Sequence, residues 1–173
     1  MELPREEFQK ETVLIVFGKN IKRAREKKKL GIRQLADAAK YDRGCISALE
    51  RGEQNLELKT AVNLARVLDV SFPALFSRSF MDGQGEAPAD TSAPFYEDDF
   101  LLVFAENFKR SLQRLRRSQT RVYVETGVSE TAVSRIVRSR NTNPTLQTLS
   151  SLAAATDADL CSLFSRTAKE DIL

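Results

Sequence analysis

Hydrophobic residues recur every three or four positions along most of the chain, which is the spacing of one face of an α-helix. Near the start, this spacing is kept by Val13, Val16, Phe17, Ile21 and Ala24. The pattern predicts an amphipathic helix over 13–28. Polar interruptions divide the rest of the first half into shorter helices, which we expect at 32–40, 43–51 and 59–68, with a last turn at 73–76.

The second half shows the same hydrophobic spacing and predicts helices at 100–117, 119–126, 130–138, 146–156 and 159–165. A short polar residue stands directly before four of the predicted helices and can accept a hydrogen bond from a free N–H group of the first turn. These residues are Asp42, Ser118, Ser129 and Asp159. No segment has a convincing strand pattern, so the fold is predicted to be all-α.

The two halves are similar in sequence as well as in pattern. The segment "FGKNIKR" (17–23) is similar to "FAENFKR" (104–110), 87 residues later. The segment "LDVSFPALFSR" (68–78) is similar to "TDADLCSLFSR" (156–166), 88 residues later. One extra residue must therefore enter the second copy, and it fits best in "RSRNTNPTLQT" (138–148), in a loop before a helix.

A segment of different composition separates the two copies. Residues 79–99 concentrate Gly, Pro, Ser and Asp, contain no Lys or Arg, and show no hydrophobic period. These properties predict a flexible linker. The expected organisation is therefore an N-terminal domain at 1–78, an acidic linker at 79–99 and a C-terminal domain at 100–173, each domain with five helices.

The distribution of charge along the 173 residues supports a polyanion as the partner. The formal net charge of +3 divides into +5 over 1–78, −6 over 79–99 and +4 over 100–173. Two basic units suit two modules that bind nucleic acid, since a positive face attracts phosphates. Solvent-exposed helix faces with an incidental basic excess are the alternative explanation.

Composition argues against an enzyme, a metal site and a bound cofactor. The chain contains no histidine, and its two cysteines, Cys45 and Cys161, lie far apart without the spacing of metal ligands. No nucleophile elbow, phosphate-binding loop or paired-carboxylate pattern occurs. No apolar run approaches the ~18 residues of a membrane span, and the acidic start does not resemble a signal peptide, so we expect a cytoplasmic protein.

Each half also contains two predicted helices joined by a short turn, and the second helix carries small residues on its outer face. This is the helix-turn-helix pattern, in which a helix enters a DNA major groove about 12 Å wide. The residues expected to face the core are Leu35, Tyr41, Ile46 and Leu49 in the first half, and Val122, Val128, Val133 and Ile136 in the second. The outer faces differ: Arg43, Gly44, Ser47 and Ala48 in one, and Glu130, Thr131, Ser134 and Arg135 in the other.

The segments "ALERGEQNLELKTAVNLARVLDVSFPALF" and "GVSETAVSRI" with "NPTLQTLSSLAAATDADLCSLF" resemble the XRE family of lambda-repressor/Cro-like helix-turn-helix domains. The resemblance covers 13–78 and 100–166. It implies two tandem five-helix DNA-binding domains in a bacterial or phage-encoded, nucleoid-associated transcription regulator, usually a repressor and often dimeric. The DNA-binding residues that it implies are Arg43, Gly44, Cys45, Ser47, Ala48, Arg51, Gln119, Glu130, Thr131, Ala132, Ser134, Arg135, Arg138 and Asn141.

Two departures from the family pattern concern particular residues. The family's glutamine at the start of the second helix, which commonly holds a phosphate, is matched by Gln119, but Ile32 stands at that place in the first half. In the family, a Glu that ends the recognition helix often pairs with an Arg of the first helix in a partly buried ion pair. The matching residues are Arg25 and Glu50 in the first half, but Leu112 and Val137 in the second. Because both members of the pair changed together, the second half is expected to keep an intact fold.

We therefore expect a sequence-specific DNA-binding regulator, with double-stranded DNA as its partner and two unlike reading heads. A linker of 21 residues has a typical end-to-end distance of roughly 25 Å, and adjacent half-sites lie about 34 Å apart, so one chain can reach both. A homodimer that uses one head per chain is the alternative arrangement. The alternative function is a protein-interaction module, similar to an antitoxin or antiactivator, in which one or both domains bind a protein partner.

Overall fold

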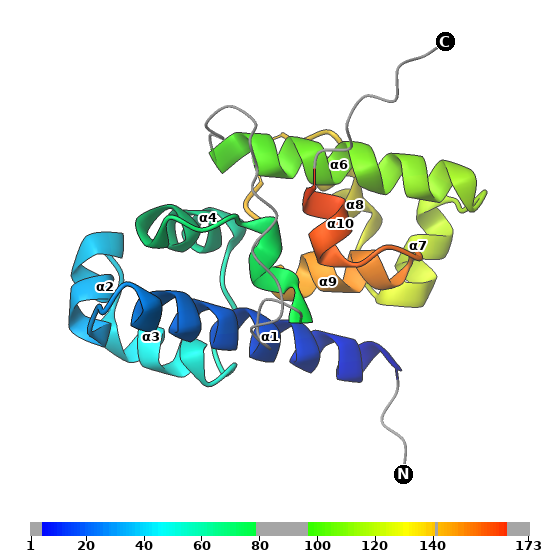
Figure 1. The fold of residues 1–173 in the computed structure, drawn as a ribbon. Helices are drawn as coiled ribbons and strands as arrows, with labels where there is room; N and C mark the ends of the chain where they lie inside the picture. Colours follow the sequence, from blue (N-terminus) through cyan, green and yellow to red (C-terminus); the bar gives the residue numbers. More distant parts are fainter. Residues whose placement is uncertain (1–4, 79–96, 141, 166–173) are drawn as a thin grey trace.

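The computed structural model describes residues 5–78, 97–140 and 142–165, and these ranges are helical with short connections (Figure 1). In the first half the elements are α1 (Arg5–Lys27), α2 (Ile32–Ala39), α3 (Arg43–Glu50), α4 (Leu58–Leu68) and the 3₁₀ turn η1 (Pro73–Phe76). In the second half they are α6 (Glu97–Arg114), α7 (Gln119–Thr126), α8 (Glu130–Val137), α9 (Leu146–Ala154) and α10 (Leu160–Phe164). Within these ranges the extended structure is an isolated antiparallel bridge between Glu57 and Thr145.

The order of helices is the same on both sides of the segment 79–96, which lies outside the described residues. The bounds of α7 and α8 follow those of α2 and α3 by 87 residues, whereas α9 begins 88 residues after α4. The difference of one residue therefore falls in the connection between α8 and α9. This is the loop in which the sequence comparison places the extra residue.

Two helices begin earlier than the hydrophobic spacing predicts. Helix α1 begins at Arg5 instead of residue 13, and α6 begins at Glu97, inside the stretch predicted as linker. Both extensions are rich in acidic residues, which are stabilising near a helix N-terminus. The spacing of hydrophobic residues marks only the part of a helix that has a clear apolar stripe, so it underestimates the length of a helix whose end is mostly polar in sequence.

All four predicted N-caps are confirmed. Asp42 accepts a hydrogen bond from the Cys45 N–H group at 3.0 Å, and Asp159 accepts one from the Ser162 N–H group at 2.8 Å. The hydroxyls of Ser118 and Ser129 accept equivalent bonds at 3.2 Å, at the starts of α7 and α8. These bonds satisfy N–H groups that have no partner inside their own helices.

Left-handed backbone conformations recur at equivalent places in the two halves. Six of the seven positive φ angles in the described residues fall into pairs 87 residues apart: Lys29 with Arg116, Lys40 with Gly127, and Gly52 with Ser139. The seventh, at Asp69, has no counterpart in the described part of the second half. Each pair follows the end of a helix, where a left-handed residue reverses the chain. The two halves therefore share turn geometry even where their turn residues differ.

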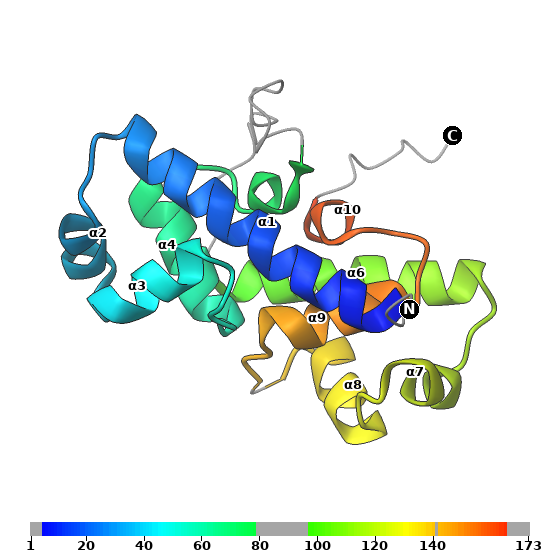
Figure 2. The same ribbon diagram turned by 90° about the horizontal axis from the view of Figure 1, so that it is seen from below.

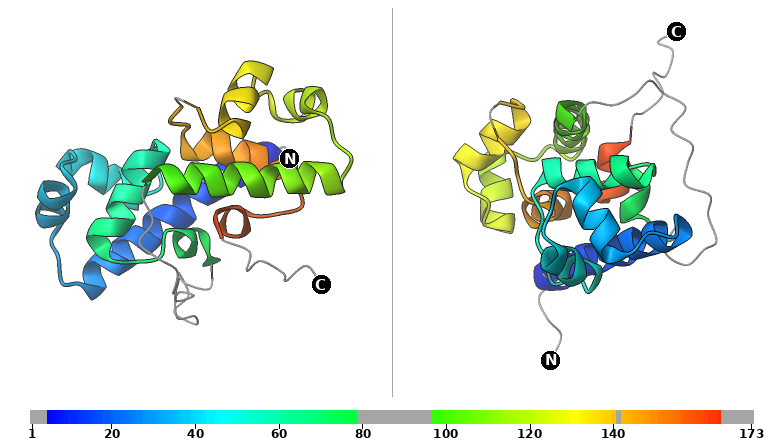
Figure 3. Two further views of the ribbon diagram at one scale, coloured as in Figure 1. Left: turned by 90° about the horizontal axis from the view of Figure 1, so that it is seen from above. Right: turned by 90° about the vertical axis from the view of Figure 1, so that its left-hand side faces the viewer.

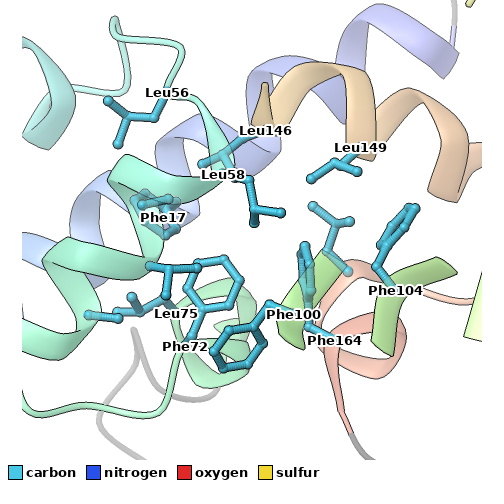
Figure 4. Packing of buried hydrophobic residues seen from close by; sticks show 14 of the residues in the cluster. Phe17, Leu56, Leu58, Phe72, Leu75, Phe100, Phe104, Leu146, Leu149 and Phe164 are labelled. Carbon is cyan, nitrogen blue, oxygen red and sulfur yellow. The ribbon is translucent and has the colours of Figure 1, made fainter. Parts of the chain in front are cut away.

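The described residues of both halves form one continuous hydrophobic core. The Phe72 ring lies 4.8 Å from the Phe100 ring and 4.9 Å from the Phe164 ring, measured between centroids (Figure 4). Leu58 and Leu146 are also fully buried in this region. Helix α1 packs along α9, so a helix of the first half covers one of the second (Figure 2).

No helix of 5–78, 97–140 or 142–165 combines the length and the apolar character that crossing a membrane requires. The longest of them, α1, carries charged residues along its length.

Candidate nucleic-acid interface

Helices α2 and α3 are held against the core by the residues that the hydrophobic pattern selects. Leu35, Ile46 and Leu49 have no exposed surface, and Tyr41 packs partly buried against them. These four inward positions are confirmed. Burial raises the pKa of the Tyr41 phenol, so this side chain stays neutral in ordinary buffers. The turn between the helices is fixed further by Asn63, whose side chain donates a 3.0 Å hydrogen bond to the Ala39 carbonyl.

The opposite side of α3 faces solvent and carries little bulk. Arg43 and Gly44 are exposed, and Cys45, Ser47 and Ala48 are half-buried. Hydrogen bonding to backbone N–H groups, Cys45 first, lowers the pKa of the Asp42 carboxyl, so the N-cap is ionised at neutral pH. The start of α3 therefore presents one exposed guanidinium beside a small residue, a combination that suits entry into a groove.

Arg51, which follows α3, is engaged with neighbouring side chains. Its guanidinium donates hydrogen bonds to Glu53 at 2.9 Å and to the Ser47 hydroxyl at 2.8 Å. The pair with Glu53 is more than half exposed and so contributes little to stability. To contact a phosphate through its Nε and Nη2 groups, Arg51 would have to release Glu53.

Arg25 and Glu50 tie α3 to α1 through a buried ion pair. The Arg25 Nε–Glu50 Oε1 distance is 2.6 Å and the Nη2–Oε2 distance is 2.9 Å, which makes the pair bidentate. Arg25 also donates to the Leu30 carbonyl at 2.8 Å. The hydrogen bond to Glu50 raises the pKa of Arg25 despite burial. At the equivalent places in the second half, Leu112 is buried and Val137 packs partly buried against the core.

Helices α7 and α8 have the same arrangement of core and surface. Val122, Val133 and Ile136 are buried and Val128 packs partly buried, which confirms these inward positions. On the outer side Glu130, Thr131, Arg135 and Arg138 are exposed, and Ala132 and Ser134 are half-buried. Gln119 is exposed at the start of α7, whereas Ile32 at the start of α2 is half-buried against the core. Asn141 lies outside the described residues.

A charged cluster that the hydrophobic pattern did not reveal attaches α7 to the rest of its half. Glu125 accepts hydrogen bonds from Arg121 and from Arg117, each at 2.7 Å, and Arg117 also donates to the Ala155 carbonyl at 2.8 Å. The hydrogen bond from Arg121, with the charges of both arginines, lowers the pKa of Glu125. The i,i+4 spacing of Arg121 and Glu125 is a usable sequence signal, but the contact with Ala155 has none.

One asparagine in each half links the last turn of that half to its first helix. The Asn20 amide donates to the carbonyls of Leu75 and Ser77 at 2.9 and 3.0 Å. The Asn107 amide donates to the carbonyls of Leu163 and Ser165 at 3.0 and 2.9 Å. These contacts were missed, although the shared asparagine of "FGKNIKR" and "FAENFKR" is the signal that marks them.

Similarity to known proteins is concentrated in the first half. The family described as helix-turn-helix matches residues 21–75, which contain α2, α3, α4 and η1. These residues form a helix-turn-helix domain. A protein of Bacillus subtilis named "Uncharacterized HTH-type transcriptional regulator YqaE" is 35% identical to the chain over 60 residues. That alignment covers 35% of this chain and 52% of the relative, so the chain spans about half of the relative's length. No solved structure matches the chain.

Two observations concern metal binding and thiol reactivity. In the part of the chain that the structure describes, no three His, Cys, Asp or Glu residues gather as a metal site. Cys45 and Cys161 are both free and half-buried, and burial raises the pKa of the Cys161 thiol, which disfavours the reactive thiolate. Arg43, Arg135 and Arg138 are exposed in or beside α3 and α8. Guanidinium groups are suited to contacts with phosphates and guanine edges.

Proposed function

We propose that the chain is a sequence-specific transcription regulator that places α3 and α8 in successive major grooves of double-stranded DNA. The observation that carries the proposal is the helix-turn-helix match over 21–75, together with the outer face of α3, which is exposed at Arg43 and Gly44 and carries small residues beyond them. The family match and the named relative support a DNA-binding regulator at the level of the family. The second reading helix and the repressor role go beyond that match.

The proposal treats residues 100–173 as a second domain of the same kind. Its support is structural: α7 and α8 reproduce the lengths of α2 and α3 with a constant offset of 87 residues. The asparagine anchors at Asn20 and Asn107 bond to equivalent carbonyls. An unrelated helical segment has no reason to share helix bounds, left-handed turns and buried amide contacts with the first half.

The residues have distinct proposed roles at DNA. Arg43 donates to guanine O6 and N7 at the start of α3, a contact that discriminates bases by about 1–3 kcal/mol. On α8 the base edges meet Thr131, Ser134 and Arg135, and Glu130 either accepts from cytosine N4 or stabilises the positive helix N-terminus. The groups that contact phosphates are Arg51, Gln119, Arg138 and Arg140.

As a repressor, the protein would act by occupying DNA that other proteins need. No chemical step is required, because a helix seated in the major groove excludes a second protein from the same groove. The affinity depends on several phosphate contacts and therefore falls steeply with salt concentration.

A protein-interaction module is the second candidate, and one observation favours it. Tyr123 and Val124 are adjacent on α7 and have relative exposures of 47% and 75%, so they give this helix an exposed apolar surface. In this alternative the outer face of α7 contacts a protein partner, and binding to random duplex DNA shows little salt dependence.

The deciding experiment selects bound duplexes from a random pool with the whole protein, and repeats the selection with Arg43→Ala and Arg135→Ala. We expect a defined site in which each substitution relaxes a different half. Arg114→Ala, an exposed arginine on α6 outside the proposed interface, is the control and should leave the site unchanged. If no sequence is enriched and binding is weak at physiological salt, the interaction-module alternative is favoured.

A further inference from the structure

The two halves are joined by backbone hydrogen bonds that cross between equivalent residues. The Leu58 N–H group donates to the Pro144 carbonyl at 2.9 Å, and the Leu146 N–H group donates to the Leu56 carbonyl at 2.8 Å. Leu58 and Leu146 are 88 residues apart, and so are Leu56 and Pro144. Each half therefore donates one backbone hydrogen bond to the other half and accepts the equivalent bond from it. The two bonds lie on either side of the Glu57–Thr145 bridge.

Side chains next to this bridge repeat the exchange. The Asn143 side-chain oxygen accepts a hydrogen bond from the Lys59 N–H group at 3.0 Å, at the start of α4. The Asn55 side-chain oxygen accepts one from the Gln147 N–H group at 3.2 Å, at the start of α9. Each asparagine thus caps the helix of the opposite half. Reciprocal contacts between equivalent residues are the property that defines a two-fold interface.

The aromatic core obeys the same symmetry. Phe76 and Phe164 are equivalent residues and stack on each other, with centroids 5.4 Å apart. Each also packs on the equivalent ring of its own half: Phe76 lies 5.3 Å from Phe17, and Phe164 lies 5.4 Å from Phe104. Helix α1 packs on α9 and, reciprocally, α6 packs on α4. An approximate two-fold axis therefore runs from the Phe76–Phe164 pair to the Glu57–Thr145 bridge.

Helices α3 and α8 lie at the bridge end of this axis, one on each side. Figure 2 shows both helices on the edge that carries the loops before α4 and α9, and the left view of Figure 3 shows the same edge from the opposite direction. The approximate axis thus relates α3 to α8, and both helices lie along the same edge of the molecule. The local two-fold axes of duplex DNA are perpendicular to its length, so a pair of helices arranged in this way meets two half-sites in inverted orientation.

We infer that the two halves of one chain are arranged like the two subunits of a two-fold dimer. In this arrangement the chain reads an inverted pair of unlike DNA half-sites at one fixed spacing. This inference rests on the proposed function and specifies the form of its DNA site. The surface that a second copy would cover is already filled by the other half of the same chain. One chain therefore binds each site, and the contacts between the halves, rather than the segment 79–96, set the distance between the half-sites.

The symmetry holds for the backbone but not for the reading surfaces. Arg43 and Gly44 stand where the second half has Glu130 and Thr131. At the bridge, the Asn143 amide donates to the Glu57 carboxylate at 2.7 Å, whereas Thr145 replaces that glutamate in the second half. The expected site is therefore an inverted repeat in geometry that is not a palindrome in sequence.

The test measures binding of the full chain to duplexes that carry both selected half-sites in inverted or direct orientation, with the spacer varied one base pair at a time. We expect the inverted pair to be bound at one spacing, with one chain per duplex by native mass spectrometry. An insertion of about five base pairs turns one half-site to the opposite face of the duplex and should weaken binding about 100-fold through loss of the second contact. Equal affinity across spacers, a preference for direct repeats, or two chains on a palindrome would overturn the inference.

A double variant tests whether the crossed caps position the two heads. In Asn55→Ala/Asn143→Ala, we expect the preference for one spacer over its neighbours to decrease at least threefold, because the halves lose their shared caps. Asn63→Ala removes an asparagine hydrogen bond inside the first half and is the matched control, which should keep the preference even where its affinity falls. An unchanged preference in the double variant would contradict the positioning role of the two asparagines.

Failure of the inference and failure of the proposed function give different results. If half-sites are enriched but orientation and spacing do not matter, the heads read DNA independently and only the internal dimer is wrong. If no duplex is enriched, the proposed function is wrong and the inference falls with it. The rotational correlation times of the free protein, from ¹⁵N relaxation, provide a check without DNA: one value shared by α3 and α8 is expected, and two shorter values would contradict the rigid pair.

Discussion

Lys40 and Gly127 occupy equivalent positions at the ends of α2 and α7, and both have left-handed backbones, with φ angles of 52° and 69°. A residue with a Cβ atom pays about 1 kcal/mol in this conformation, whereas glycine does not. A Cβ atom added at Gly127 would meet no atom within 4 Å, so a substitution there changes only the backbone preference. We expect Gly127→Lys to lower the free energy of unfolding by about 1 kcal/mol and Lys40→Gly to raise it, as measured by urea denaturation. Changes of the same sign would contradict this account.

The Arg25–Glu50 pair and the Leu112–Val137 pair are two solutions for one buried position. Arg25→Leu or Glu50→Val alone leaves a buried charge without its partner and should cost about 3–5 kcal/mol. The double variant should recover most of this loss, since the second half folds with the apolar pair. The Leu30 carbonyl still loses the donor that Arg25 supplies, so recovery is expected to be incomplete. A double-mutant cycle in guanidinium measures the coupling, and additive losses would disprove it.

At the scale of elements, Gly18 sets how closely α1 and α3 approach. A Cβ atom at Gly18 would lie 2.0 Å from the Leu49 carbonyl oxygen, a distance that forces the helices apart. Glycine to alanine in a helix is ordinarily stabilising by about 1 kcal/mol. Here we expect Gly18→Ala to destabilise by about 1–3 kcal/mol, measured as a lower thermal midpoint. The equivalent residue, Ala105, is buried without such a conflict, so the sign of the change tests the close approach.

The attachment of α7 through Glu125 predicts a dependence of stability on pH. The pKa of this carboxyl is lowered below its ordinary value of 4.5, first by the Arg121 hydrogen bond and then by the charges of Arg117 and Arg121. The contribution of the Glu125 carboxylate to the free energy of unfolding is therefore complete above pH 4.5 and is lost as the pH falls through the lowered pKa. We expect Glu125→Gln to reduce the thermal midpoint at neutral pH and to flatten its acid decline. If the thermal midpoints of the original protein and of Glu125→Gln decrease in parallel as the pH falls, the ion pairs of Glu125 do not stabilise the protein.

The sequence predicts the elements better than their contacts. Hydrophobic spacing selects buried residues such as Leu35 and Val133, and polar caps such as Asp42 and Ser129 mark the starts of helices, because both signals are local. The bonds of Leu56 and Pro144 leave no such signal, since each of these residues lies outside a helix and bonds to a partner 90 or 86 residues away, respectively. The exposed faces of α3 and α8 follow from the same spacing by exclusion, whereas the engagement of Ser47 by Arg51 does not.

At the scale of the whole molecule, the shared core predicts that the two halves unfold together. Phe164 belongs to α10 but packs on Phe72 and Phe76 of the first half as well as on Phe104 of the second. We expect Phe164→Ala to destabilise by about 3–5 kcal/mol and to increase amide hydrogen exchange in α3 as much as in α8. Exchange that increases only in α8 would show that the halves are independent.

The arrangement of the halves is the property that a linear reading of the sequence misses most. A segment rich in Gly and Pro suggests two tethered units, and the repeat gives no reason to expect more. The contact surfaces, such as Phe76 and Leu58, have the same composition as an ordinary domain interior. Only the three-dimensional pairing shows that part of each half's hydrophobic surface is covered by the other half.

The crossed hydrogen bonds at the bridge, which join two halves of one chain, affect how the occupancy of a DNA site would depend on protein concentration. A regulator assembled from two separate chains is a dimer only above its dissociation constant, so the occupancy of its site rises with the square of concentration when the protein is scarce. In this protein both partners of the pair are synthesised together and are present in equal number at any dilution. Under the proposed function, the occupancy of its DNA site at low concentration is therefore expected to rise linearly with concentration, even where only a few copies are present.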